Sequence, residues 1–126
     1  MTMMNTNSNL NFLLNLQLQL KICHWQTKGH ARHIALGKLY EILDPLIDEY
    51  IEQHMGKYGR FILDDETKTF NVENLKELDV HKFCKSVAEE LVNFTSSLDE
   101  TDTNLLNIRD EMLGAVYKTA YLLTQD

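Results

Sequence analysis

The sequence is poor in the two residues that most often interrupt helices, with one proline and five glycines among 126 residues. An all-β fold of this length needs many tight turns, and tight turns draw heavily on both residues. Leucine, glutamate and lysine are abundant and favour helix. The composition therefore predicts an all-α protein, and the length suits one domain around a single core.

Positive charge is also scarce, because 12 lysines and arginines face 19 aspartates and glutamates. The formal net charge is -7 at pH 7 with neutral histidines. Affinity for nucleic acid comes largely from clustered basic residues, and no basic cluster stands out here. The charge therefore disfavours nucleic acid as a partner.

Long apolar runs are missing, and the opening stretch does not resemble a signal peptide. No uninterrupted run reaches the roughly 18 residues that a membrane-spanning helix needs, and the opening stretch MTMMNTNSN has no basic residue. We expect a soluble cytoplasmic protein without a membrane partner. The two cysteines, Cys23 and Cys84, lack the paired spacing of zinc or redox sites and are expected to be buried free thiols.

The clearest helical periodicity lies in the second half of the chain. Apolar residues recur at steps of three and four over residues 80–98, preceded by Asp79 as N-cap, and again over residues 102–124. The connector between these helices is short. We therefore predict two antiparallel neighbours.

The first half predicts two further helices, over residues 7–28 and 31–55. In the first, leucines alternate with polar residues as in a half-buried strand, but the same segment also has a helical face and a lone strand would have no partner. In the second, Pro45 predicts a kink near residues 41–44. The alternative is a helix that stops at Leu43 and restarts at Pro45.

About two dozen residues separate the second and third predicted helices, too many to be structureless in a compact domain. Residues 61–63 and 69–72 could form a short hairpin around a polar turn at residues 64–68, or residues 72–78 could hold helical turns. Two helical hairpins joined by one long crossover predict a ferritin-like four-helix bundle, with residues 1–126 as a single domain.

Residues that suit a metal ion concentrate in the first two predicted helices. Four of the five histidines fall within 31 residues: His24, His30, His33 and His54. Asp44, Asp48 and Glu52 follow at four-residue steps on the second helix, with Glu41 nearby. Imidazole and carboxylate ligands together suit iron, manganese or zinc. Such a carboxylate row is also common on solvated helix faces, and we expect His54 and His81 at the surface.

A complete metal centre within one chain is not expected. The usual di-iron bundle needs a Glu-x-x-His pair on each of two helices, and the sequence contains none. A glycine-flanked serine nucleophile and a glycine-rich phosphate loop are also missing.

The segment CHWQTKGHARHIALGKLYEILDPLIDEYIE resembles the His-Trp opening and following helix of the Dps proteins, ferritin-like proteins that form hollow shells and oxidise iron at subunit interfaces. The resemblance is strongest over residues 10–52, and the last helix fits in a general way. It implies that His24 and His33 of one subunit face Asp48 and Glu52 of a two-fold mate. The segments HWQTK and ARH are still more similar to a small ferritin-like family encoded by bacteriophages and large viruses. This resemblance implies that the protein is found in the cytoplasm of a host cell.

The chain departs from the Dps pattern in two respects. A further ligand on the second helix, an aspartate in that family, aligns with Gly37, and neither Glu41 nor His30 is a clean replacement. The lysine-rich tail with which some Dps members bind DNA is also missing, so DNA condensation is not expected. Trp25 is interpreted as a packing anchor where the first helix ends.

Two functions follow from these observations. The first is a Dps-like homo-oligomer that binds iron, and oxidises Fe(II) as a ferroxidase, at an intersubunit site made by His24, His33, Asp48 and Glu52. The alternative is a non-catalytic, degenerate bundle that acts as an oligomeric interaction module, with Gly37 marking the loss of the metal centre.

Overall fold

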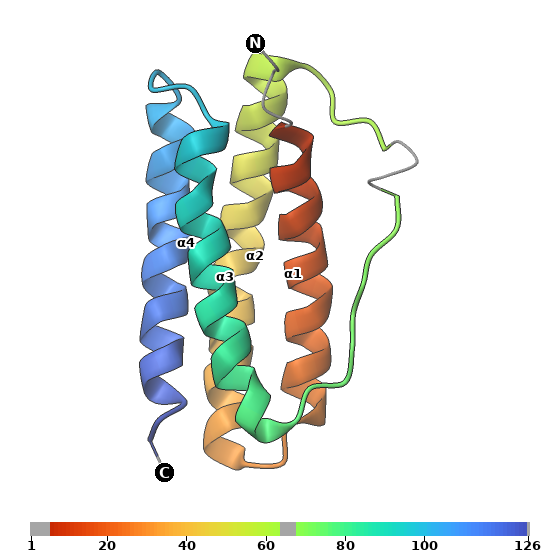
Figure 1. Ribbon diagram of the computed structural model, residues 1–126, viewed down its shortest axis with the longest axis vertical. Helices are drawn as coiled ribbons and strands as arrows, with labels where there is room; N and C mark the ends of the chain where they lie inside the picture. The colour runs from red at the N-terminus through yellow and green to blue at the C-terminus, as the bar shows by residue number, and fades with distance from the viewer. Residues whose placement is uncertain (1–5, 64–67, 126) are drawn as a thin grey trace.

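The computed structural model of the protein describes residues 6–63 and 68–125, and this part is helical without any strand (Figure 1). Four helices follow one another along the chain: α1 (Thr6–Gln26), α2 (His30–Tyr58), α3 (Glu77–Ser97) and α4 (Thr103–Leu122). α1 and α2 are antiparallel, as are α3 and α4, whereas α2 and α3 run in the same direction because the crossover between them returns along the bundle (Figure 1). Contacts join α1 to α2, α2 to α4, α4 to α3 and α3 to α1, which closes a four-helix bundle.

The four helices confirm the predicted elements to within a few residues at each end. The strand alternative for the first segment is wrong: along α1, Leu16 and Leu20 point into the core while Leu18 is exposed. The interrupted second helix is also wrong, because α2 continues through Pro45. Pro45 and Glu41, whose carbonyl the proline leaves without its helical partner, both have exposed side chains, so water can reach this side of the helix.

The core is made by apolar side chains that recur every three or four residues on all four helices. Its largest fully buried members include Leu13 and Leu20 of α1, Leu36, Leu39, Leu43, Ile47 and Tyr50 of α2, Leu91 of α3, and Leu105 and Met112 of α4. Cys23 and Cys84 belong to this core as buried free thiols, which confirms the prediction. Burial raises the pKa of the Cys84 thiol to about 12, so it stays protonated.

The crossover contradicts both sequence predictions for this segment. Residues 61–63 and 69–72 form no hairpin strands, and no helix begins before Glu77; of the predicted turn, residues 64–67 lie outside the described residues. The backbone of the crossover bonds instead to side chains of α1. Asn15 accepts from and donates to the backbone of Asn71, and Gln19 does the same with Glu73. A neighbouring strand or a helical turn is therefore not needed to satisfy these groups.

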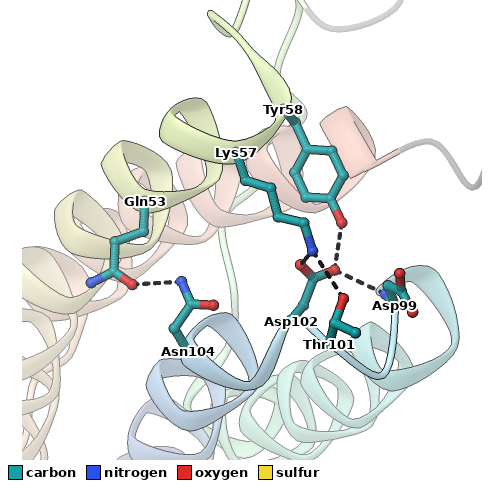
Figure 2. Close-up of polar contacts among 7 residues, drawn as sticks. All are labelled: Gln53, Lys57, Tyr58, Asp99, Thr101, Asp102 and Asn104. Atoms are coloured by element: carbon teal, nitrogen blue, oxygen red, sulfur yellow. Dashed lines mark hydrogen bonds and ion pairs between the residues drawn. The ribbon is translucent and has the colours of Figure 1, made fainter.

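At the other end of the bundle, a buried carboxylate joins α2 to the start of α4. Asp102, which is completely buried, accepts hydrogen bonds from the Lys57 ammonium, the Tyr58 hydroxyl and the Asp99 amide (Figure 2). Burial alone would raise the pKa of Asp102, but these hydrogen bonds outweigh it and hold the pKa below its usual range. The carboxylate is therefore ionised in the folded protein and orders the loop between α3 and α4.

We predict that Asp102→Asn destabilises the bundle by about 1 to 3 kcal/mol, because an amide nitrogen then faces donors that have lost their acceptor. Urea denaturation followed by circular dichroism measures the free energy of unfolding. Glu100→Gln removes the same charge from an exposed side chain in the same loop and should change that free energy by less than about 0.5 kcal/mol. Equal effects of the two substitutions would show that charge, and not the buried hydrogen bonds, is responsible.

Candidate functional site

Two histidines face each other across the short turn between the first two helices. His24 lies in the last turn of α1, and His33 lies in the first turn of α2, where its amide bonds to the carbonyl of Gly29 at 2.9 Å. Residues 27–29 alone connect α1 to α2. The short connection therefore brings two imidazoles together that are nine residues apart in sequence.

The two rings form a reciprocal arrangement, which we call the histidine pair. Nδ1 of His24 lies 2.9 Å from the backbone oxygen of His33, and Nδ1 of His33 lies 2.8 Å from the backbone oxygen of His24. The rings stack with centroids 3.9 Å apart and an interplanar angle of 20°. Because a carbonyl only accepts, each Nδ1 carries the hydrogen, and in a neutral ring Nε2 then carries the lone pair. Each member of the histidine pair therefore retains one atom able to bind a metal.

Gly37, one turn further along α2, lies against the ring of His24. A Cβ added at Gly37 would lie 2.7 Å from Cε1 and 3.1 Å from Nδ1 of His24, and the first distance is too short for a real contact, so the ring would have to shift. A glycine inside a helix costs about 1 kcal/mol of stability relative to alanine. The contact with the His24 ring explains why position 37 nevertheless has no side chain. The aspartate that the Dps resemblance places here would require the His24 ring to move.

The structure does not bring the predicted carboxylates to the histidine pair of the same chain. Asp48 and Glu52 lie on the exposed side of α2, and Asp48 is about 22 Å from His33 along the helix axis. His30 and Glu41 are also exposed. Among residues 6–63 and 68–125, no group of three or more histidines, cysteines, aspartates or glutamates is placed to hold a metal ion. One chain thus provides two imidazoles without further protein ligands.

Comparison with known proteins places this chain within a family. The model of a family of unknown function, DUF5856, matches residues 24–123, a range that begins at His24 and includes all four predicted ligands. The chain belongs to the DUF5856 family. It is 27% identical over 115 residues to an uncharacterized 14.6 kDa protein from the mobD-ri intergenic region of Enterobacteria phage T4, a match that covers 91% of this chain and 84% of the relative. No solved structure matches.

The phage relative supports the expected phage or viral source, whereas the family shown is DUF5856 and not Dps. Within the described part of the chain, none of the helices is both long and apolar enough to cross a lipid bilayer.

Trp25 does not anchor the bundle, contrary to the prediction. Its side chain is 68% exposed at the end of α1. The core face of α1 passes through Leu20 and Cys23, and Trp25 lies off that face together with the exposed Leu18. Trp25, the neighbour of His24 in this DUF5856 chain, is therefore exposed at the surface beside the histidine pair, and so is Ile34 on α2.

His54 is a second polar residue that the sequence analysis misplaced, because it is 2% exposed and not at the surface. It follows Tyr50 by one helical turn on the core face of α2, and its ring centroid lies 4.8 Å from that of Tyr58. Neither ring nitrogen has a hydrogen-bond partner among the described residues. Burial lowers the pKa of His54, and the nearby Asp102 carboxylate only partly opposes this effect. The sequence did contain a signal for this burial, because His54 continues the helical spacing of the buried residues Leu43, Ile47 and Tyr50.

His81, also expected at the surface, is half-buried at the start of α3.

We predict that Gly37→Ala destabilises the protein by about 1 to 3 kcal/mol, because the new methyl group displaces the His24 ring from its carbonyl partner. Gly114→Ala is the matched control: it lies in α4 with open space around it and should stabilise by up to about 1 kcal/mol through helix propensity. Urea denaturation measures both.

The same experiment in a His24→Ala background identifies the cause. With the ring removed, Gly37→Ala should behave as Gly114→Ala does. If Gly37→Ala destabilises equally with and without the ring, the contact with His24 is not the reason for the glycine.

We also predict a loss of stability on acidification between about pH 7 and pH 5 that depends on His54. The pKa of His54 in the folded state is lowered from its ordinary value of 6.5, so the unfolded chain binds more protons in this range. The contribution of the neutral ring to stability is therefore fully present above pH 6.5 and is lost as the pH falls toward the folded-state pKa. Asp102 and Glu77, whose pKa values are lowered from 3.8 and 4.5, lose their contributions only at still lower pH.

Thermal unfolding across this pH range tests the prediction. His54→Phe should reduce the difference in Tm between pH 7 and pH 5, whereas His30→Gln, at an exposed position, should leave that difference unchanged. An undiminished slope in His54→Phe would assign the acid sensitivity to other groups.

Proposed function

We propose that this DUF5856 protein binds iron between two copies of the chain, with the imidazoles of His24 and His33 from one copy and the carboxylates of Asp48 and Glu52 from the other. The observation that carries the proposal is the histidine pair. Histidines that bind metals usually donate their second ring N–H to a carbonyl or carboxylate, which fixes the tautomer and the ring orientation. Both members of the pair have such a carbonyl partner for Nδ1.

The exposure of the four residues is compatible with a site that forms on association. His24 is half-buried, and His33, Asp48 and Glu52 are exposed, so an ion and a second chain can reach all of them. Asp48 and Glu52 are one turn apart on the same side of α2, where two carboxylates can share an ion. Their distance from the histidine pair of the same chain requires the second copy.

The donor set and the connectivity are both compatible with iron. Neutral imidazole with carboxylate is a ligand set that Fe(II) accepts, and two antiparallel hairpins joined by one long crossover are the connectivity of ferritin-like bundles. Iron is here a substrate, oxidised to Fe(III) with dioxygen as the oxidant. Affinity should fall in acid, since both ligand types must be deprotonated to bind.

A second candidate function is a metal-free oligomeric interaction module. The observation that favours it is the apolar surface beside the histidine pair, where the described residues of the same chain provide no further metal ligand. On this proposal the histidine pair only closes the turn between α1 and α2. Trp25 and Ile34, 68% and 42% exposed beside it, provide apolar surface for a partner.

Complementation between two inactive variants tests whether iron binds across a contact. One variant carries His24→Asn and His33→Asn, and the other carries Asp48→Asn and Glu52→Gln. Neither should bind Fe(II) in anaerobic titration or develop Fe(III) absorbance on exposure to oxygen. After mixing and refolding together, random pairing into dimers should restore about a quarter of the wild-type sites, because each mixed dimer contains one complete ligand set.

Glu49→Gln is the matched control, since Glu49 is exposed on α2 beside Asp48 but outside the proposed ligand set. It should bind as the wild type does. A wild-type oligomer without iron uptake would reject the metal site and favour the interaction module, and a strict monomer in sedimentation would reject both proposals.

A further inference from the structure

The turn between α1 and α2 is held by a carboxylate from α3. Glu77, the first residue of α3, lies at the same end of the bundle as this turn (Figure 1). Its carboxylate accepts hydrogen bonds from the Thr27 hydroxyl at 2.9 Å and from the Lys28 amide at 2.8 Å. Nε of Arg32, in the first turn of α2, forms an ion pair with the same carboxylate at 3.5 Å. One side chain of α3 thus contacts both the turn and the helix that follows it.

The bond to the Lys28 amide determines where α1 ends. Along an α-helix, each amide donates to the carbonyl four residues earlier. The Thr27 amide still follows this rule, with the Cys23 carbonyl at 3.0 Å. The next bond of the series would join the Lys28 amide to the His24 carbonyl, but this amide donates to Glu77. The His24 carbonyl is therefore one of the terminal acceptors that a helix leaves for other donors.

The His24 carbonyl is also the acceptor that the histidine pair uses. Nδ1 of His33 lies 2.8 Å from it, and this bond keeps the lone pair of the His33 ring on Nε2. A carbonyl can accept two hydrogen bonds, but a helical bond from the Lys28 amide would also extend α1 by one residue. Such an extension advances the helix end by about 1.5 Å and rotates it by about 100°. The start of α2, and the His33 ring with it, would then move relative to the His24 carbonyl.

The turn itself provides no substitute for Glu77. Gly29 is the N-cap of α2 and forms no side-chain cap, and the first turn of α2 has no acidic residue. The order of the turn therefore depends on a residue that is 49 positions away from Lys28 in the sequence.

The charge of Glu77 strengthens this contact. The Lys28 amide contributes most to a lowered pKa of Glu77, so the carboxylate is ionised. A hydrogen bond from an amide to an ionised carboxylate is stronger than one to a neutral carbonyl. The Lys28 amide therefore prefers Glu77 to the His24 carbonyl.

We infer that Glu77 is a positioning residue for His33, because it holds the Lys28 amide and so ends α1 where the His24 carbonyl can accept from the His33 ring. The α3–α4 hairpin thereby fixes the tautomer of a residue on the α1–α2 hairpin. The consequence for iron rests on the proposed function, whereas the tautomer of His33 is a property of the chain without a metal ion.

Nitrogen-15 NMR of the histidine rings tests the inference on the full chain without metal. At about pH 8.5, where histidine is ordinarily neutral, His33 of the wild type should have its hydrogen on Nδ1. Glu77→Ala should raise the ratio of the Nε2–H to the Nδ1–H form of His33 about fivefold or more, as expected for the loss of one hydrogen bond. Glu77→Gln retains an oxygen that accepts from the Lys28 amide and should keep the wild-type tautomer.

His24 is the internal control, because its ring donates to the carbonyl of His33 on α2 and not to the end of α1. Its tautomer should stay unchanged in Glu77→Ala. An unchanged His33 ring in a folded Glu77→Ala variant would overturn the inference. An equal change in both rings would also overturn it, because it would indicate a general loosening of the turn.

Two further variants separate positioning from stability. Thr27→Val removes the other donor of the turn but leaves the Lys28 amide bonded to Glu77, so the His33 tautomer should be retained. Asp102→Asn weakens the bundle at its other end and should also leave this tautomer unchanged. A change in His33 caused by Asp102→Asn would assign the effect to stability and reject the role of Glu77.

Hydrogen exchange of the wild type decides the matter if Glu77→Ala does not fold. The Lys28 amide should exchange at least about tenfold more slowly than the His30 amide, which lies at the start of α2 without a helical partner. Equal exchange of the two amides would show that Glu77 does not hold Lys28.

Anaerobic Fe(II) titration extends the test to the proposed iron site. Residues that orient metal ligands typically change metal affinity by about 10- to 100-fold, so Glu77→Ala should weaken Fe(II) binding about tenfold or more, and Glu77→Gln should bind as the wild type does. Equal affinity in the wild type and Glu77→Ala would overturn the role of Glu77 at the site. A wild type without Fe(II) binding would reject the iron site alone, since the tautomer of His33 is measured without metal.

Discussion

The approach of α1 to α2 at their connecting turn depends on one contact, the ring of His24 against the bare backbone of Gly37. Only three residues link the two helices, so their ends must lie close together, and a side chain at position 37 would displace the His24 ring that packs between them. The carbonyl bonds of the histidine pair then hold both helix ends in register. The remainder of the bundle is assembled on this hairpin, because α3 contacts α1 and α4 contacts α2.

Outside the helices, polar side chains provide hydrogen-bond partners for backbone groups. Along the crossover, Asn15 and Gln19 replace the partner strand that an extended segment would otherwise need. At the loop between α3 and α4, the buried Asp102 accepts hydrogen bonds from side chains of α2 and from a backbone amide of the loop itself. The amides fasten the crossover to α1, whereas the carboxylate joins α2 to the start of α4, so of these two contacts only the second links one helical hairpin directly to the other.

The helices could be predicted from the sequence because their apolar residues repeat with the helical period, and Pro45 did not interrupt α2 because it lies on the exposed side. The crossover could not be predicted in this way. Its hydrogen-bond partners are amides more than 50 residues away, and no local pattern indicates a segment paired with side chains. His54 and Trp25 were misjudged for a related reason: residue type suggested surface and core, whereas their positions on the helical faces require the reverse.

At the candidate site, the sequence predicted which imidazoles meet but not what holds them. The Dps resemblance implied that His24 and His33 belong to one site, and the structure stacks their rings across the short turn between α1 and α2. The role of Gly37 could not be predicted from the sequence, because the sequence does not distinguish a glycine that makes room for a ring from a glycine that replaces a lost ligand. The contact distance of 2.7 Å gives the glycine a structural reason of its own.

This structural reason changes how the absent aspartate bears on function. If the ring needs the space at position 37, glycine there follows from the packing of α1 on α2 and does not by itself indicate a degenerate metal centre. The proposed iron site then depends on the outer side of α2, where Asp48 and Glu52 are exposed to a second copy.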